Sequence, residues 1–171
     1  YLSYYARIHG LRAVALRFSN VYGPRQDPHG EAGVVAIFCG KLLAGEPLTV
    51  FGDGTQTRDY VYVGDVADSM LRAVHFAPPK SAGMNARAFN IGTGVATSVL
   101  ELASALMRAA GRSVAVEFAP ARPGEQLQSY LTITKAAAEL GWRPTVSLAQ
   151  GLAETYAWFG QRAITSSPSR G

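Results

Sequence analysis

Two arginines stand at predicted strand ends, far apart in the chain. Arg58 lies two residues before the strand-like run 60–63, and Arg122 lies in the turn-rich segment after a predicted strand at 114–118. A guanidinium group can form two parallel hydrogen bonds to phosphate oxygens, and it stays charged at any working pH. Two such groups are what a diphosphate requires, so we predict that Arg58 and Arg122 bind one. The alternative is that both are ordinary solvated loop residues, which are common.

Other polar residues are predicted at the same edge. Glu125 follows Arg122 across a Pro-Gly turn and can accept hydrogen bonds from a ribose diol; alternatively it forms a surface ion pair with Arg122, worth less than about 1 kcal/mol. Asn20 and Arg25 follow the predicted strand 11–18 and offer hydrogen-bonding groups and a charge; alternatively, Asn20 satisfies backbone groups of its own turn. Because ligands of open α/β sheets bind beyond the carboxyl ends of strands, we expect these loops to converge.

Weaker signals lie elsewhere in the sequence. The turn Gly92-Thr93-Gly94 follows a predicted strand and precedes a predicted helix, as a dinucleotide-binding fingerprint would, but Thr97 stands where a third glycine is needed. The three histidines lie in different predicted elements, and no spacing predicts a metal site. Asp59, next to Arg58, is interpreted as a solvated residue of a hairpin joining 48–51 to 60–63.

The hydrophobic patterns that would position these loops alternate between strands and helices. Strands are predicted at 11–18, 48–51, 60–63, 88–91 and 114–118, and helices at 1–10, 33–44, 65–77, 98–110, 134–140 and 147–162. This alternation predicts an α/β fold with a largely parallel sheet. Residues 1–162 are predicted to form one folded unit, and 163–171 a flexible tail.

Composition limits the possible functions. The chain has 171 residues, 48% of them hydrophobic, and a net charge of +4. Its basic residues are scattered rather than clustered, which argues against nucleic-acid binding and suits a small anionic ligand. Cys39, the single cysteine, is expected to be buried in an apolar helix. No apolar stretch is long enough to span a membrane and no signal peptide is recognisable, so we expect a cytoplasmic protein.

Five strings of residues carry a resemblance to a known family. They resemble the C-terminal half of the NAD-dependent epimerase/dehydratase family, within the extended short-chain dehydrogenases/reductases, and the likeness extends over nearly the whole chain, about residues 1–159. The strings are LRFSNVYGPRQDP, GEPLTVFGDGTQTRDYVYVGDV, FNIGTG, RPGE and LGWRPTVSLAQGL. The resemblance implies the last parallel strands of a Rossmann-type fold together with a small substrate-binding subdomain.

The resemblance also implies roles for individual residues. Arg58 and Arg122 would bind the diphosphate of a UDP-sugar, and Glu125 would bind its ribose. The uracil would lie against Val50 and Phe51, and the nucleotide would also contact backbone groups of Val34 and Val35. Asn20 would contact the pyrophosphate and the sugar, and Tyr22 and Arg25 would line the sugar pocket. Phe18 and Ser19 would lie against the nicotinamide of NAD.

The implied activity is 4-epimerisation of UDP-glucose and UDP-galactose, in which a hydride leaves C4 of the sugar for NAD and returns to the other face. Decarboxylation of UDP-glucuronate and 4,6-dehydration of dTDP-glucose remain alternatives within the same family. A third possibility is a chain that only binds nucleotide sugars.

The catalytic pair of the family is absent from these residues. No Tyr-x-x-x-Lys motif and no Gly-rich NAD fingerprint occur in the 171 residues, so we expect no catalytic residue in this chain. NAD would be bound mainly by an N-terminal half that is missing here, and the fragment alone would be inactive. The resemblance further implies a homodimer for the full-length protein.

Overall fold

The computed structural model describes residues 1–28, 33–78 and 83–166. The helices are α1 (Leu2–His9), α2 (Val34–Ala44), α3 (Val63–His75), α4 (Met84–Arg87), α5 (Val99–Ala110), α6 (Thr134–Glu139) and α7 (Leu148–Ser166). The strands are β1 (Ala15–Phe18), β2 (Asn20–Tyr22), β3 (Leu48–Phe51), β4 (Thr57–Arg58), β5 (Tyr60–Tyr62), β6 (Ala88–Ile91), β7 (Thr97–Ser98) and β8 (Val116–Ala119). Among the described residues, no helix is both long and apolar enough to cross a bilayer.

The strands pair mostly in parallel, which confirms the predicted fold class. β1 pairs with β6, β2 with β5, and β3 with β8, all in parallel, whereas β4 and β7 are antiparallel. The predicted hairpin between 48–51 and 60–63 is wrong. β3 pairs instead with β8, far along the chain, because Leu48 and Val50 of β3 are buried in the core that includes α5. In the turn that follows β3, Gly52 and Gly54 adopt φ of 68° and 75°.

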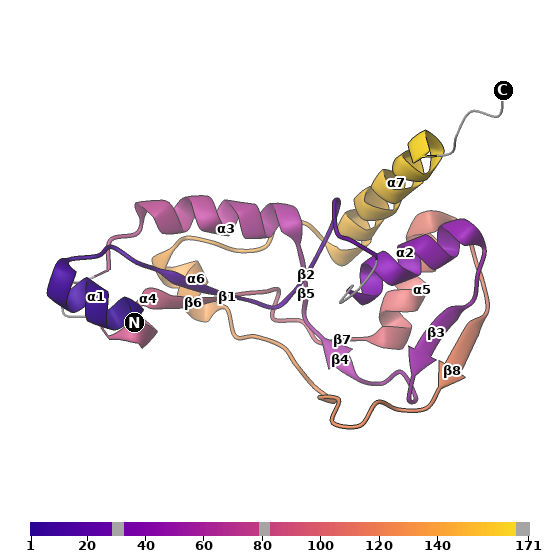
Figure 1. The fold of residues 1–171 in the computed structure, drawn as a ribbon, viewed down its shortest axis with the longest axis horizontal. Helices are drawn as coiled ribbons and strands as arrows, with labels where there is room; N and C mark the ends of the chain where they lie inside the picture. Colours follow the sequence, from indigo (N-terminus) through magenta and orange to yellow (C-terminus); the bar gives the residue numbers. More distant parts are fainter. Residues whose placement is uncertain (29–32, 79–82, 167–171) are drawn as a thin grey trace.

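Two hydrophobic cores hold these elements together. One joins α2, α5, α7 and β3 through residues such as Phe38, Leu102 and Leu152. The other lies around β5, β6 and α6 and includes Phe89 and Trp142. Figure 1 shows the corresponding arrangement: α3 runs along the β1–β6 pair, while α2 and α5 lie near β3 and β8, and α7 packs against α2 and α5. This division matches the implied parallel strands with an attached small subdomain.

Helix ends follow the local sequence closely. Gly10, Gly45 and Gly111 adopt the left-handed conformation after α1, α2 and α5, as expected of C-terminal caps. Ser98 and Glu101 form the predicted reciprocal capping box of α5.

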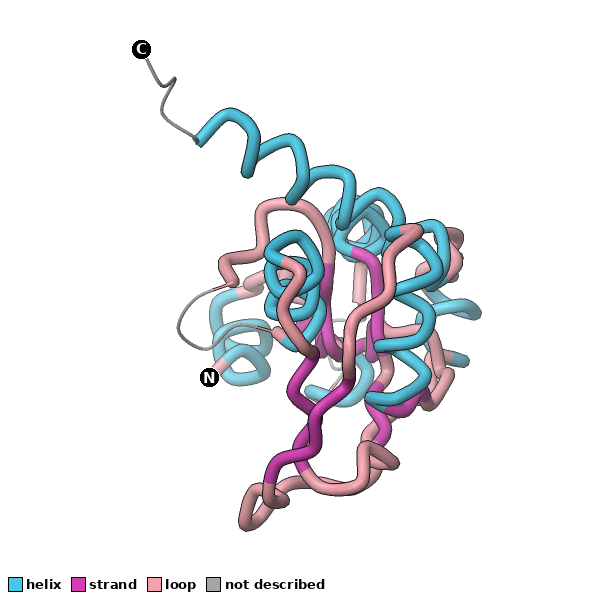
Figure 2. Tube along the Cα trace, turned by 90° about the vertical axis from the view of Figure 1, so that its right-hand side faces the viewer, coloured by secondary structure: helices cyan, strands magenta, loops and turns pink. Residues whose placement is uncertain are grey.

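Two boundaries differ from the prediction. β1 begins only at Ala15, since a strand needs a partner and β6 pairs with Ala15 to Phe18 alone. Helix α7 continues to Ser166, because no proline interrupts it before Pro168, and it projects away from the strands (Figures 1 and 2). The rest of the predicted tail, 167–171, lies outside the described residues.

Candidate functional site

Arg58 is held at the strand end by partners from a distant loop. Its Nη2 forms an ion pair with Oε1 of Glu125 at 3.1 Å, and its Nη1 donates to the carbonyls of Thr57 and Gln126 at 2.8 and 2.6 Å. The Arg58 side chain is 19% exposed, so solvent screens this pair only in part. The ion pair therefore joins Glu125 to Arg58, and not to Arg122 as the alternative interpretation held.

Arg122 faces the same space from the other side. Its guanidinium carbon lies 3.9 Å from the centroid of the Phe51 ring, within the range of a cation–π contact. The guanidinium of Arg122 and the ring of Phe51 are both flat, so either can stack with a flat group of a ligand. The two arginines predicted from their strand ends thus lie on one cavity, together with an aromatic ring and a carboxylate.

The cavity has a volume of about 600 Å³, which is the size of a typical small-molecule site. Its charged groups are the cations Lys41, Arg58 and Arg122 and the carboxylate of Glu125, so its electrostatic balance favours an anion. The complete lining is Asn20, Gly33, Val34, Ile37, Phe38, Lys41, Thr49, Phe51, Gln56, Arg58, Tyr60, Val99, Arg122 and Glu125.

Four polar residues of this lining were missed by sequence reasoning. Lys41 donates to Thr49 Oγ1 at 2.8 Å and to the Pro47 carbonyl at 3.1 Å, while Gln56 donates to the Phe51 carbonyl at 2.9 Å. The fourth is Tyr60, which is buried on β5. Alternation along β3 could have identified Thr49, because it shares the face of Phe51. No local signal marks Lys41, which reaches the cavity from α2.

Some predicted binding residues lie elsewhere. Val35 and Val50 are buried in the core. Adjacent residues on a helix or strand point in different directions, so Val34 and Phe51 line the cavity while Val35 and Val50 face the core. A contact of Val35 through its backbone stays a prediction. Tyr22 packs edge-on against Tyr62 and donates to the Leu148 carbonyl at 3.5 Å, so it faces α7 rather than this cavity.

Phe18 is the last residue of β1, and Ser19 follows it. The Phe18 ring is 40% exposed at the carboxyl end of the strand. The Ser19 hydroxyl is buried and has no hydrogen-bond partner among the described residues. A contact of Phe18 and Ser19 with NAD stays a prediction.

Asp59 is a structural anion rather than a solvated loop residue. It is 1% exposed, and its carboxylate accepts hydrogen bonds from the backbone N–H groups of Thr93, Gly94 and Leu131 at 2.7, 3.0 and 3.3 Å and from the Thr93 hydroxyl at 2.7 Å. The Gly92-Thr93-Gly94 turn does bind an anion, but that anion is the protein's own carboxylate. Asp59 thereby fixes the strand that presents Arg58.

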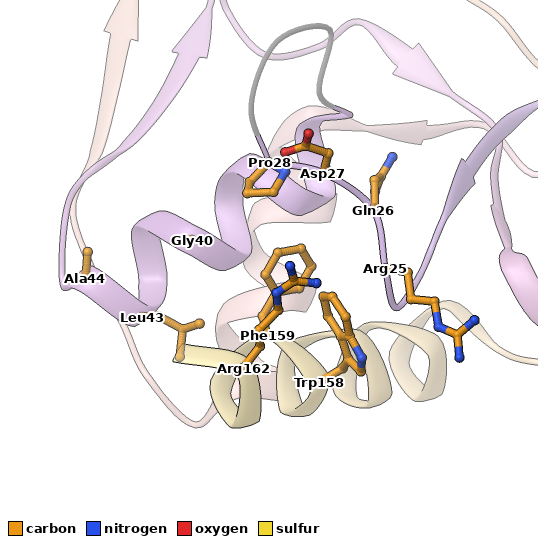
Figure 3. A pocket seen from close by; sticks show the side chains of 10 residues that line it. All are labelled: Arg25, Gln26, Asp27, Pro28, Gly40, Leu43, Ala44, Trp158, Phe159 and Arg162. Atoms are coloured by element: carbon orange, nitrogen blue, oxygen red, sulfur yellow. The ribbon is translucent and has the colours of Figure 1, made fainter. Parts of the chain in front are cut away.

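A larger cavity of about 790 Å³ lies between α2 and α7. Figure 3 shows Trp158, Phe159 and Arg162 pointing from α7 toward Asp27 and Pro28. Arg25 also lines it, at a strained φ of 71°, but none of the other predicted binding residues does. Both Asp27 and Arg162 already have partners. The smaller cavity, where the predicted groups converge, is therefore the candidate site.

Comparisons with known proteins identify the family of the chain. The model of the NAD dependent epimerase/dehydratase family matches residues 1–92. A UDP-glucose 4-epimerase from Mycolicibacterium smegmatis is 47% identical over 163 residues, which cover 95% of this chain and 50% of the relative. More distant relatives include a dTDP-glucose 4,6-dehydratase from Actinoplanes sp. at 35% identity and a UDP-glucuronic acid decarboxylase from Arabidopsis thaliana at 36%.

Solved structures of UDP-glucose 4-epimerases are similar to this chain. The UDP-glucose 4-epimerase of Thermotoga maritima, crystallised with UDP-glucose, superposes with a TM-score of 0.87 at 46% identity, covering 95% of this chain and 50% of that one. The Thermus thermophilus enzyme in complex with NAD gives a TM-score of 0.80 at 44% identity, covering 93% of this chain and 50% of that one. The chain thus spans about half the length of the relatives it matches.

Proposed function

The chain belongs to the NAD-dependent epimerase/dehydratase family, and from that premise we propose that it is the substrate-binding portion of a UDP-glucose/UDP-galactose 4-epimerase, an isomerase. The observation that carries the proposal is the convergence of Arg58, Arg122 and Glu125 with the Phe51 ring on one cavity. Identities of 44–47% to UDP-glucose 4-epimerases support the choice of reaction.

Each group has a role that follows from its chemistry. The arginines bind the two phosphates, because each guanidinium can direct paired N–H donors at phosphate oxygens. Phe51 lies beside the uracil. In this structure the guanidinium of Arg122 packs on the Phe51 ring. Glu125 accepts hydrogen bonds from the ribose hydroxyls, and Asn20 contacts the pyrophosphate and the sugar.

The cofactor enters from the β1 end of the site. Phe18 and Ser19 lie against the nicotinamide, with the exposed Phe18 side chain limiting its position. When bound, NAD supplies the hydride acceptor and donor for the change at C4 of the sugar. The proton-transferring Tyr-x-x-x-Lys pair of the family does not occur in these 171 residues, so the chain alone is expected to bind without turning over.

Two further assignments are proposed for the full-length protein. It is a homodimer, as the family resemblance implies, and it is located in the cytoplasm. Decarboxylation of UDP-glucuronate or dehydration of dTDP-glucose would use the same diphosphate and nucleoside contacts, and relatives at 35–36% identity carry those names. Product analysis of the full-length protein with UDP-glucose, UDP-glucuronate and dTDP-glucose separates the three reactions. Nucleotide-sugar binding without turnover of any of them would favour a binding-only protein.

Arg122→Ala is expected to weaken UDP binding about tenfold in isothermal titration calorimetry. The effect is moderate because Arg122 is exposed, so water screens much of its attraction for the diphosphate. Uridine, which lacks phosphate, serves as the control ligand, and its affinity should change much less. An equal loss for uridine and UDP would contradict the assignment of Arg122 to the diphosphate.

A further inference from the structure

The hydroxyl of Tyr60 is a buried polar group without a hydrogen-bond partner among the described residues. The residue is only 4% exposed and belongs to the core around α2, α5 and α7. Buried hydroxyls in folded proteins are nearly always paired with protein or water, so an unpaired one requires an explanation. A group that is satisfied only when a ligand is present is one such explanation.

The backbone places Tyr60 among the predicted anion-binding groups. Arg58 and Tyr60 are two residues apart on an extended segment, so their side chains leave the same face. Asp59, between them, points the other way into the Gly92–Gly94 turn. On the neighbouring strand, Asn20 is the register partner of Tyr60. Asn20, Arg58 and Tyr60 all line the candidate site.

Tyr60 also borders a second cavity of about 460 Å³. The described residues that line this second cavity carry no charge: they are Tyr60, Thr93, Val95, Thr97, Pro144, Thr145, Val146, Ser147 and Leu148. The cationic groups lie on the other side of the ring, at the candidate site. An anionic ligand near Tyr60 is therefore held on the side of Arg58 and Arg122.

The phenol keeps its proton at neutral pH. Burial raises the pKa of Tyr60 to about 12, outweighing the opposite pull of the Arg58 charge. A protonated phenol beside cationic groups is a hydrogen-bond donor for an anionic oxygen, and such charge-assisted bonds are stronger than neutral ones.

We infer that Tyr60 is a ligand-binding residue whose hydroxyl donates a hydrogen bond to a phosphate oxygen of a bound nucleoside diphosphate. The inference rests on the proposed function, since it assigns a third donor to the diphosphate site formed by Arg58 and Arg122. It adds an uncharged residue to a site that was otherwise predicted from its charged groups.

The test compares Tyr60→Phe with the wild type, using calorimetry with UDP and uridine and thermal unfolding of the ligand-free protein. UDP binding should weaken about tenfold, as expected for one hydrogen bond to a charged oxygen, while uridine binding stays the same. The Tm of the free protein should not fall, because the deleted hydroxyl has no partner to lose. Tyr62→Phe is the matched control: the Tyr62 hydroxyl donates to Glu154 at 2.7 Å, away from the site, so UDP binding should be unchanged.

Two results would overturn the inference: UDP binding by Tyr60→Phe equal to that of the wild type, or a lower Tm for the free variant, which would reveal a structural partner. A wild-type protein that does not bind UDP would instead refute the proposed function. The two failures are therefore distinguishable.

Discussion

Asp59→Ala is expected to lower the free energy of unfolding by about 3 to 5 kcal/mol. The substitution removes the acceptor for three backbone N–H groups and one hydroxyl at a position that is 1% exposed. Each buried donor left without a partner costs on the order of 1 to 3 kcal/mol, and partial access of water reduces the sum. Urea unfolding followed by circular dichroism measures the change.

Asp53→Ala provides the matched control for this prediction. Asp53 also accepts two hydrogen bonds, from the backbone N–H and hydroxyl of Thr55 at 2.9 and 2.7 Å, but in an exposed turn where water can replace it. Its loss should therefore destabilise the fold far less. Equal effects of the two substitutions would contradict the structural role of Asp59.

Arg58→Ala is expected to weaken UDP binding about 100-fold, more than Arg122→Ala. Arg58 is mostly buried and its guanidinium is fixed by Glu125 and by the Thr57 and Gln126 carbonyls, so its direction is set before the ligand arrives. A preorganised charge in a partly desolvated site contributes more binding free energy than a charge screened by water. Removing it also frees Glu125 from its partner, leaving a carboxylate near the phosphates.

The measurement is calorimetric titration with UDP, and Arg108→Ala is the charge-matched control. Arg108 is exposed on α5 and does not line the cavity, so its loss changes the net charge equally without touching the site. The affinity of the Arg108→Ala variant for UDP should stay near that of the wild type. If the Arg58 and Arg108 variants lose affinity to the same degree, the effect is one of overall charge and the assignment of Arg58 fails.

Local sequence predicted individual elements better than their pairing. Leu48–Phe51 and Ala88–Ile91 are strands at the predicted residues, because each is a short apolar run between turn formers. The sequence around Gly52 to Gly54 equally suggested a hairpin, whereas β3 pairs with β8. That partner lies far away in sequence and is selected by burial of β3 against α5, which no local pattern contains.

The candidate site was predictable where charge and strand ends coincide. Arg58, Arg122 and Glu125 stand out in the sequence as charged residues beside turns, and the structure brings them together. Lys41 and Tyr60 do not stand out, because one is an ordinary helix lysine and the other an ordinary strand aromatic. Asp59 was misinterpreted because its partners, in the loops at 93–94 and 131, become neighbours only on folding.

A crystal structure of the protein with UDP-glucose tests the central claim most directly. We expect the diphosphate within hydrogen-bonding distance of Arg58 and Arg122, the uracil beside Phe51 and the ribose hydroxyls on Glu125, all in the cavity of about 600 Å³. A nucleotide bound instead in the cavity between α2 and α7, or one whose phosphates contact neither arginine, would contradict it.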